Sequence, residues 1–209
     1  EEVKLLIFSN PCNPTSIGLD RAAVRRLLQS VSTLVVLDEA YMDFWDQSML
    51  PEFQNYDNLL ILKTCSKAFG LAALRVVFAV GDEKLIREVK AVKSPYNVNS
   101  LSQKLAETVL LAEEDCDAAF RCILDSRDAL QAGLNELAQR FPDRMEVIES
   151  VTNFIVMKTA RAGELFRYLL GRSIAVRYFA DMSALRITAG APEENAAVLR
   201  EMAAFFENE

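Results

Sequence analysis

Histidine is missing from this sequence of 209 residues, and its absence removes several kinds of chemistry at once. A Cys/His zinc site cannot form, and neither Ser-His-Asp nor Cys-His catalysis is available. The four cysteines make no C-x-x-C pair, so we expect no metal site. Any acid–base chemistry must come from lysine, aspartate, glutamate, tyrosine or cysteine.

The sequence also lacks a basic tract and a long apolar run. Lysine and arginine number 23 against 30 acidic residues, and they are scattered, leaving a net charge of −7. This balance argues against nucleic acid or an anionic membrane surface as a main partner. Because the apolar runs are short, no charged-then-apolar leader is seen, and the cysteines form no disulfide pattern, we expect a cytoplasmic protein.

Short apolar runs alternate with helical segments in the first half of the chain. Asp20 is the expected N-cap of a helix through Gln29, and a second helix should begin at Asp82. Uninterrupted β-branched runs between helices indicate strands buried on both faces, the pattern of an α/β fold with a mostly parallel sheet. The four expected strands cover residues 3–8, 33–37, 59–63 and 76–80.

After Pro95 the pattern changes to long helical segments and short strands. Residues 101–140 are expected to form one long helix, or two with a break near 113–115. Pro192 stands where a first-turn proline opens a final helix. We therefore expect a partial large domain over residues 1–110 and a small C-terminal α+β domain over residues 111–209. Its strands are expected near 146–149, 153–157, 174–176 and 184–188, with a helix over 162–170.

Reactive side chains follow the ends of the first three expected strands. Ligands of open α/β sheets bind outside the carboxyl ends of the strands, so these side chains should converge on one crevice. They are Asn13 after the first strand, Asp38 and Tyr41 after the second, and Thr64, Ser66, Lys67 and Arg75 after the third.

This set suits an aldehyde cofactor with a pyridine ring and a phosphate. A lysine amine can condense with an aldehyde, and a carboxylate can keep a pyridine nitrogen protonated. Hydroxyls and a guanidinium can hold a phosphate. Each residue alone has a plainer interpretation: Asp38 as a cap or turn residue, Lys67 as a surface lysine, Arg75 as half of a surface ion pair. Only their joint order and spacing favour the cofactor.

Three segments resemble motifs of the fold-type I aminotransferases that use pyridoxal 5′-phosphate (PLP). Residues 10–15, N-P-C-N-P-T, resemble the family's N-P-x-N-P-T-G. Residues 35–41 resemble its apolar strand followed by D-E-A-Y. Residues 64–75, T-C-S-K-A-F-G-L-A-A-L-R, resemble its lysine segment T-x-S-K-A-F-G-L-A-G-L-R. Within the family, residues 38–44 and 95–103 are most similar to histidinol-phosphate aminotransferases, although threonine-phosphate decarboxylases share much of the layout.

The resemblance implies a role for each matching residue. Lys67 would carry the cofactor and move a proton between it and the substrate Cα, and Asp38 would pair with the pyridine nitrogen. The other implied cofactor contacts are Asn13 and Tyr41 on the ring hydroxyl, and Thr64, Ser66 and Arg75 on the phosphate.

Three weaker similarities lie in the C-terminal part. Residues 152–155 resemble the family's A-N-F-I/L strand, which includes Asn153 as a substrate-binding residue. Residues 185–190 resemble L-R-I-T-V-G, whose arginine, here Arg186, clamps the substrate α-carboxylate. Residues 174–177 resemble I-x-V-R, so Arg177 is expected either to touch a second anion of the substrate or to form a surface salt bridge.

The resemblance implies amino-group exchange between an amino-acid-like phosphate ester and 2-oxoglutarate in a homodimer. One alternative is a PLP-dependent decarboxylase of a phosphorylated amino acid. The other is an inactive remnant or oligomerising scaffold, because the family has a long further stretch before the first strand and we expect this chain to lack it. Ser16, Ala73 and Val77 also replace family glycines, and their extra atoms could hinder close backbone approach to a phosphate.

Overall fold

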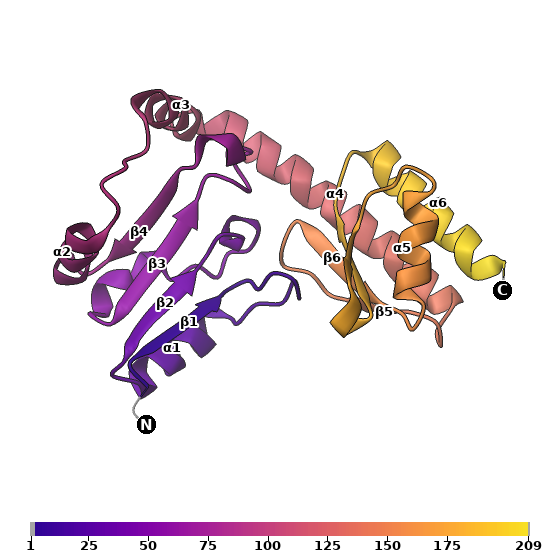
Figure 1. The fold of residues 1–209 in the computed structure, drawn as a ribbon, viewed down its shortest axis with the longest axis horizontal. Helices are drawn as coiled ribbons and strands as arrows, with labels where there is room; N and C mark the ends of the chain where they lie inside the picture. Colours follow the sequence, from indigo (N-terminus) through magenta and orange to yellow (C-terminus); the bar gives the residue numbers. More distant parts are fainter. Residues whose placement is uncertain (1–2, 209) are drawn as a thin grey trace. The chain divides into compact units, whose positions relative to one another are not determined.

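The computed structural model describes residues 3–208, which form two compact units (Figure 1). The first unit contains residues 3–12 and 18–118, and the second contains residues 13–17 and 119–208. Residues 13–17 therefore belong to the second unit, the chain then returns to the first, and it passes finally into the second unit at residue 119, within a long helix. The domain boundary at residue 110 stays a prediction, eight residues before this crossing.

A four-stranded sheet forms the centre of the first unit. Its strands lie in the order β1-β2-β3-β4, with β1, β2 and β3 parallel and β4 antiparallel to β3. The four expected strands are confirmed, each within two residues of its predicted bounds. Because three strands run parallel, their carboxyl ends meet at one edge of the sheet. The bounds are β1 Leu5–Ser9, β2 Leu34–Asp38, β3 Leu59–Thr64 and β4 Val77–Gly81.

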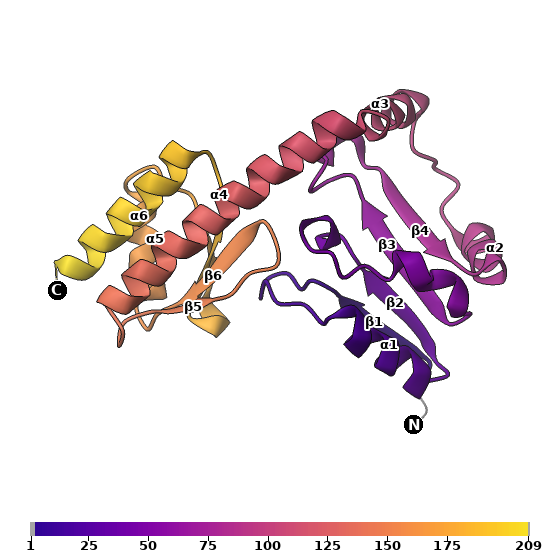
Figure 2. The same cartoon turned by 180° about the vertical axis from the view of Figure 1, so that it is seen from behind.

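Helix α1, Arg21–Ser30, covers one face of this sheet (Figure 2). Its buried residues Val24 and Leu28 pack against alternate residues of β2 and β3. The predicted cap is confirmed, since the Asp20 Oδ1 accepts a hydrogen bond of 2.6 Å from the backbone N–H of Ala23. The strand residues in this core are Val35, Leu37, Leu59 and Ile61.

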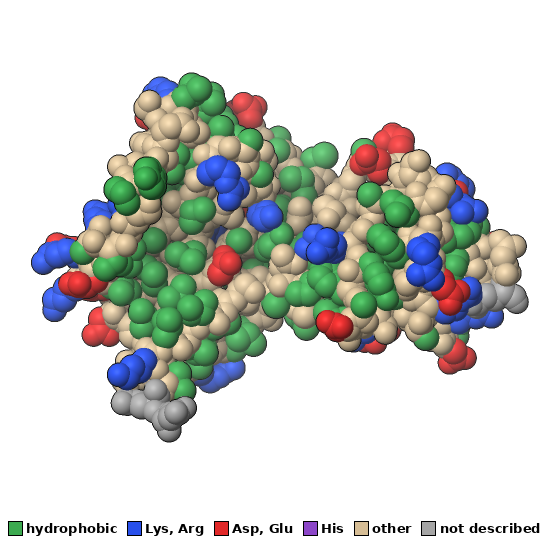
Figure 3. Space-filling model, in the orientation of Figure 1, with side chains coloured by type: hydrophobic (Ala, Val, Ile, Leu, Met, Phe, Trp, Pro, Cys, Tyr) green, Lys and Arg blue, Asp and Glu red, His purple; other side chains and the backbone are tan. Residues whose placement is uncertain are grey.

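The opposite face of the sheet is apolar and partly exposed (Figure 3). Leu5 and Ile7 of β1 are 47% and 62% exposed, and Val77 of β4 is 55% exposed. The prediction that the strands are buried on both faces is therefore wrong for β1 and β4. Apolar residues on both sides of these strands produced the prediction, but only the side that faces α1 is packed into a core.

Helices and short 3₁₀ turns complete the first unit. Of the two alternatives for residues 101–140, the two-helix one is confirmed, with the break at Leu111 and Ala112. The helix expected to start at Asp82 begins one residue later, at Glu83, and Asp82 is its N-cap, accepting from the Lys84 N–H at 2.8 Å. The bounds are η1 Met42–Phe44, η2 Leu50–Asn55, η3 Ala72–Leu74, α2 Glu83–Val92, α3 Ser100–Leu110 and α4 Glu113–Arg140.

The second unit is an antiparallel sheet of order β5-β6-β8-β7 with helices on one face. The later half of α4 and helices α5, Ala162–Leu170, and α6, Pro192–Glu207, pack against Ile155, Met157 and Leu185. Pro192 is the first residue of α6, as predicted. The strands are β5 Glu146–Ile148, β6 Phe154–Lys158, β7 Arg177–Phe179 and β8 Ala184–Thr188, with a 3₁₀ turn η4 Ala180–Met182 between the last two.

The strand expected at residues 174–176 is wrong, because β7 begins only at Arg177. The Ile174 N–H is used by the end of α5, donating to the Leu169 carbonyl at 3.0 Å. Ile174 and Val176 pack against the core of the second unit instead of joining the ladder. The apolar character of Ile174 and Val176 correctly indicated that they pack against a core, but it does not require them to form a strand.

Within residues 3–208, no helix is both long and apolar enough to cross a membrane.

The loop between β1 and α1 is closed at its base by a side-chain clamp. The Asn10 amide donates to the Leu19 carbonyl at 2.9 Å and accepts from the Leu19 N–H at 2.7 Å. Within the loop, Ser16 has φ of 63°, the left-handed region that favours glycine. Its carbonyl accepts from the Val151 N–H at 3.1 Å, so the conformation is fixed within the second unit.

We predict that Ser16→Gly stabilises the protein, because glycine adopts this φ without steric cost. The free energy of unfolding should rise by about 0.5–1 kcal/mol, the left-handed penalty less the extra chain entropy of glycine. Urea denaturation of wild type and variant measures the change. Ser16→Ala is the control, since it keeps the Cβ and loses only the Oγ, and it should not stabilise. A glycine variant less stable than the alanine variant would contradict the prediction.

Candidate active site

Asp38 ends β2 at the carboxyl edge of the first sheet. Its Oδ1 accepts a hydrogen bond of 3.0 Å from the Ala40 N–H, so the carboxylate also fixes the turn that follows the strand. Side chains alternate along a strand, and the register places Asp38 beside Leu62 on the face opposite α1. Thr64 lies on this same face, two residues further along β3.

Tyr41 and Lys67 lie close together on adjacent turns beyond this edge. The Lys67 Nζ is 5.3 Å from the centre of the Tyr41 ring, which is within the range of a cation–π contact. Tyr41 is buried, 8% exposed, while Lys67 is exposed. A buried phenol ring thus lies beside an accessible amine.

Thr64, Ser66 and Arg75 line the turn between β3 and β4. The Thr64 hydroxyl lies 2.9 Å from the Ser66 hydroxyl and accepts from the Ser66 N–H at 3.1 Å. Arg75 is exposed, has φ of 59°, and donates to the Ala72 carbonyl at 2.9 Å. Val77 stands directly opposite Thr64 in the ladder, so the side chain that replaces a family glycine lies beside this hydroxyl.

A buried charged cluster that the sequence did not reveal lies under the same edge, on the α1 side of the sheet. The Lys63 Nζ is 2.5 Å from the Asp43 Oδ1 and 4.0 Å from the Glu39 Oε2. The Glu39 side chain is fully buried and accepts from the Ser48 hydroxyl and the Met49 N–H. Lys63 in an otherwise apolar strand was the available signal, because its position in the alternation faces the core.

The second unit holds the remaining candidates, with Arg186 at their centre. The Arg186 Nη1 donates to the Asn13 Oδ1 at 2.6 Å, and its guanidinium lies 4.9 Å from the centre of the Phe154 ring. Its Nε is buried and has no hydrogen-bond partner among the described residues. Arg177 stands directly opposite Arg186 in the β7–β8 ladder, so two cations face one another on the side of the sheet away from its helices.

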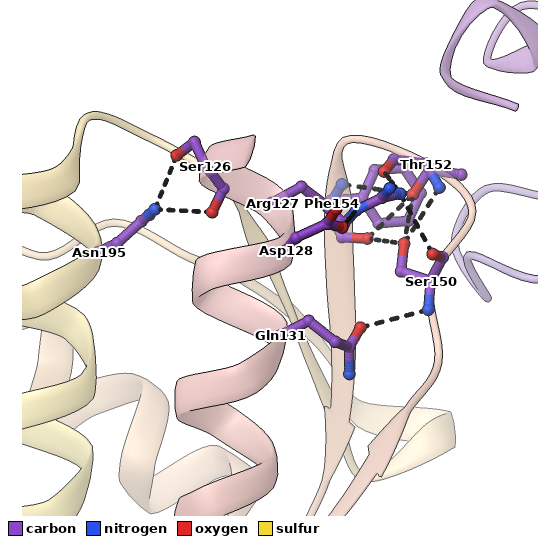
Figure 4. Close-up of polar contacts among 8 residues, drawn as sticks. All are labelled: Ser126, Arg127, Asp128, Gln131, Ser150, Thr152, Phe154 and Asn195. Carbon is purple, nitrogen blue, oxygen red and sulfur yellow. Dashed lines mark hydrogen bonds and ion pairs between the residues drawn. The ribbon is translucent and has the colours of Figure 1, made fainter. Parts of the chain in front are cut away.

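The turn at Ser150 and Thr152, which leads into Asn153, is held by polar side chains of α4 and by its own buried hydroxyls (Figure 4). The Arg127 Nη1 donates to the Ser150 and Thr152 carbonyls at 3.2 and 3.0 Å. Gln131 accepts from the Ser150 N–H, and the Asn153 carbonyl accepts from the Ala189 N–H. The sequence did not predict Arg127 or Gln131, since both look like ordinary polar residues of a long helix.

The predicted residues therefore fall into two groups. The first unit contains Asp38, Tyr41, Thr64, Ser66, Lys67 and Arg75, all at the carboxyl edge of its sheet or on the turns that follow. The second unit contains Asn13, Asn153, Arg177 and Arg186. Among residues 3–208, no three acidic or cysteine side chains are arranged to hold a metal ion.

The model of a known family, aminotransferase class I and II, matches residues 1–202. The chain belongs to this family. The family depends on PLP, so the predicted recognition, fold class and cofactor are confirmed at the level of the family.

Individual relatives agree with this assignment. The chain is 37% identical over 202 residues to a histidinol-phosphate aminotransferase of Clostridium novyi, covering 95% of the chain and 55% of that protein. It therefore spans about half the length of the curated relatives it matches.

Solved structures share its fold. The histidinol-phosphate aminotransferase of Clostridium acetobutylicum aligns with a TM-score of 0.89 at 21% identity, covering 99% of the chain and 65% of that protein. The L-threonine-O-3-phosphate decarboxylase of Porphyromonas gingivalis aligns with a TM-score of 0.83 at 25% identity, covering 98% and 65%.

The buried carboxyl of Glu39 predicts a pH dependence of stability. Burial raises its pKa, Asp43 raises it further, and the hydrogen bonds of Ser48 and Met49 and the charge of Lys63 oppose the shift. A group with a raised pKa in the folded state stabilises fully only below its unfolded pKa, and loses this contribution as pH rises through the folded value. The stability of wild type relative to Glu39→Gln should therefore fall as pH rises from the ordinary glutamate pKa through the raised one, by about 1.4 kcal/mol for each pH unit that separates the two.

Urea denaturation at a series of pH values measures this difference. Glu52 is a matched control of opposite sign, because a hydrogen bond from Arg25 lowers the pKa of its carboxyl. Its contribution is present above the unfolded pKa and is lost as pH falls through the lowered value. A wild-type curve parallel to that of Glu39→Gln at all pH values would contradict the assignment.

Proposed function

We propose that this chain supplies the lysine-bearing, substrate-anchoring part of a PLP-dependent aminotransferase of the histidinol-phosphate type. The observation that carries the proposal is the position of Lys67, whose amine lies 5.3 Å from the Tyr41 ring centre beyond the carboxyl edge of a parallel sheet. Asp38 ends the neighbouring strand at that edge. An amine, a phenol and a carboxylate thus occupy adjacent turns at the place where α/β sheets bind ligands.

The residues of the first unit fit the cofactor in kind and in placement. Lys67 would bind its aldehyde, and Asp38 would hold a proton on its ring nitrogen. Thr64, Ser66 and Arg75 offer two hydroxyls and a guanidinium for a dianionic phosphate. Arg75 already adopts an exposed left-handed conformation at the end of η3, where its side chain is accessible to such a ligand.

When bound, the pyridine ring of PLP supplies an electron sink for a substrate Cα. The residues of the chain supply the rest. Lys67, once deprotonated, would accept the proton of the substrate Cα and deliver it to a carbon of the cofactor. Asp38 would stabilise the positive charge at the ring nitrogen, and Tyr41 would donate a hydrogen bond to the ring hydroxyl oxygen of the cofactor.

The arginines of the second unit favour a substrate with two anionic groups. Like charges directly opposite in an antiparallel ladder repel, so the Arg177–Arg186 pair is unfavourable unless an anion lies beside it. Arg186 also keeps a buried Nε without a hydrogen-bond partner among residues 3–208. 2-Oxoglutarate would offer two carboxylates to these guanidiniums and histidinol phosphate its one phosphate, and Asn153 of the same unit would add a polar contact.

A second candidate reaction is decarboxylation of a phosphorylated amino acid. The likeness to the Porphyromonas gingivalis decarboxylase supports it, and the same two arginines would bind the phosphate of such a substrate. Product analysis separates the two reactions, since decarboxylation releases carbon dioxide and transamination yields a keto acid.

We further propose a cytoplasmic homodimer. Val92, Tyr96 and Leu101, between the end of α2 and the first turn of α3, are 84%, 90% and 69% exposed, and a partner subunit would cover such apolar side chains. Sedimentation at several concentrations tests this part independently of the reaction.

The first functional prediction concerns Lys67. Mixing the chain with PLP should give a visible absorption band, and borohydride should then fix the cofactor on Lys67, because only a covalent nitrogen–carbon link survives reduction. Peptide mass mapping locates the label. Lys67→Ala should lose the band and the label, whereas Lys84→Ala, an exposed lysine of α2, should keep both.

Two results would contradict the prediction for Lys67. A label spread over surface lysines, or an absorption band unchanged in Lys67→Ala, would leave the aminotransferase and decarboxylase readings without support and favour a non-catalytic scaffold.

A second functional prediction concerns the two arginines. Arg186→Leu should weaken 2-oxoglutarate binding by about 10- to 100-fold, the size of one or two lost hydrogen bonds to a charged group. Arg177→Leu should weaken it about tenfold if it binds the second anion, and not at all if it is a surface residue. Isothermal titration of the PLP-loaded protein measures the affinities. Arg167→Leu on α5 is the control, and equal losses in all three variants would contradict an anion site.

A further inference from the structure

The charged cluster of Glu39, Asp43 and Lys63 has no part in the proposed chemistry. The Lys63 and Asp43 side chains are only 17% and 16% exposed, and Glu39 is fully buried. All three lie on the α1 side of the sheet, opposite the face that carries Asp38 and Thr64. They are therefore placed behind the proposed cofactor residues, not among them.

Burying such a charged cluster contributes little net free energy to the stability of a fold. Taking charges out of water costs more than a single ion pair returns, and apolar residues of similar size often stabilise as well or better. The cluster also leaves the Asp43 Oδ2 buried and without a hydrogen-bond partner among the described residues. Its specific value must lie in the geometry that it imposes.

The geometry that it imposes is that of the Asp38–Phe44 turn. Glu39 directly follows Asp38. Asp43 is the middle residue of η1, the 3₁₀ turn that begins directly after Tyr41. Glu39 ties this turn to residues 48 and 49 through hydrogen bonds of 2.5 and 2.8 Å. Lys63 ties it to β3 through the 2.5 Å contact with Asp43, and β3 leads into the segment of Lys67. One ammonium therefore joins the two chain segments that carry the candidate residues.

We propose that Lys63 is a positioning residue, which holds the turn carrying Asp38 and Tyr41 in register with the Lys67 segment by its contacts with Asp43 and Glu39. The expected effect on PLP binding rests on the proposed function. The position of the turn can be measured without the cofactor.

Trp45 makes that separate measurement possible. It is the single tryptophan of the chain and follows η1 directly. Its ring packs against Gly18, where an added Cβ would lie 2.2 Å from the Trp45 Cζ3. Its fluorescence therefore reports a displacement of the turn.

The test compares Lys63→Met with Lys63→Arg and Asp43→Asn in the full chain. Lys63→Met removes the charge and should shift the Trp45 emission and weaken PLP binding about tenfold. Lys63→Arg keeps both ion pairs and should restore the emission and bind PLP within about threefold of wild type. Asp43→Asn keeps the shape and one hydrogen-bond acceptor, so it should fold and give an intermediate loss.

Arg25→Met is the matched control. Arg25 forms an ion pair of 2.6 Å with Glu52, near the start of β3, whereas Lys63 stands near its end. The two sites are separated by about five strand residues, or roughly 15 Å. Loss of the Arg25 pair should lower stability without changing the affinity for PLP.

The outcomes separate the two proposals. Lower stability of Lys63→Met with unchanged Trp45 emission and PLP affinity would overturn the positioning role and leave only a structural one. If Lys63→Met does not fold, unchanged PLP affinity and emission in Asp43→Asn would overturn it instead. If wild type does not bind PLP, the proposed function fails, while the emission shifts still decide whether Lys63 holds the turn.

Discussion

The arrangement of this chain depends on the parallel pairing of β1, β2 and β3. Parallel strands end at the same edge of the sheet, so strand pairing alone brings the residues after each strand together there. Asp38 and Lys67 are 29 positions apart in sequence, yet Asp38 is the last residue of β2 and Lys67 comes three residues after β3. The hydrophobic core between α1 and this sheet fixes the register, and the register fixes which reactive residues are neighbours.

Alternation along the strands then assigns a different task to each face. Asp38 and Glu39 are consecutive carboxylates, but the pleat sends the first to the open face and the second into the core. The open one stays available to a ligand. The buried one accepts two hydrogen bonds and has a raised pKa, so it acts on the backbone instead. A single step along the chain thus separates a candidate cofactor residue from a carboxylate that holds the backbone.

The sequence predicted the elements and the candidate residues better than it predicted their support. The cap at Asp20, the helix start near Asp82 and the proline that opens α6 are local features, and these were confirmed. The strand at 174–176 failed because the backbone of Ile174 is used by the end of α5, a contact that no local pattern reveals. Lys63 and Arg127 were missed for the same reason, since their partners lie far away in sequence. The roles of the ten candidate residues stay predictions.

Lys63 and the two arginines of the second unit differ in how their charges are balanced, and this difference separates a cation that orders the chain from cations left for a ligand. In the first unit, Lys63 is matched by two carboxylates, so its charge is already compensated. In the second unit, Arg177 and Arg186 face each other across a ladder, and the contact of Arg186 with Asn13 is to a neutral amide. Uncompensated cations attract an anionic ligand, whereas compensated ones order the chain. By this criterion Lys63 orders the chain, whereas Arg177 and Arg186 are the cations of the second unit that an anionic group would neutralise.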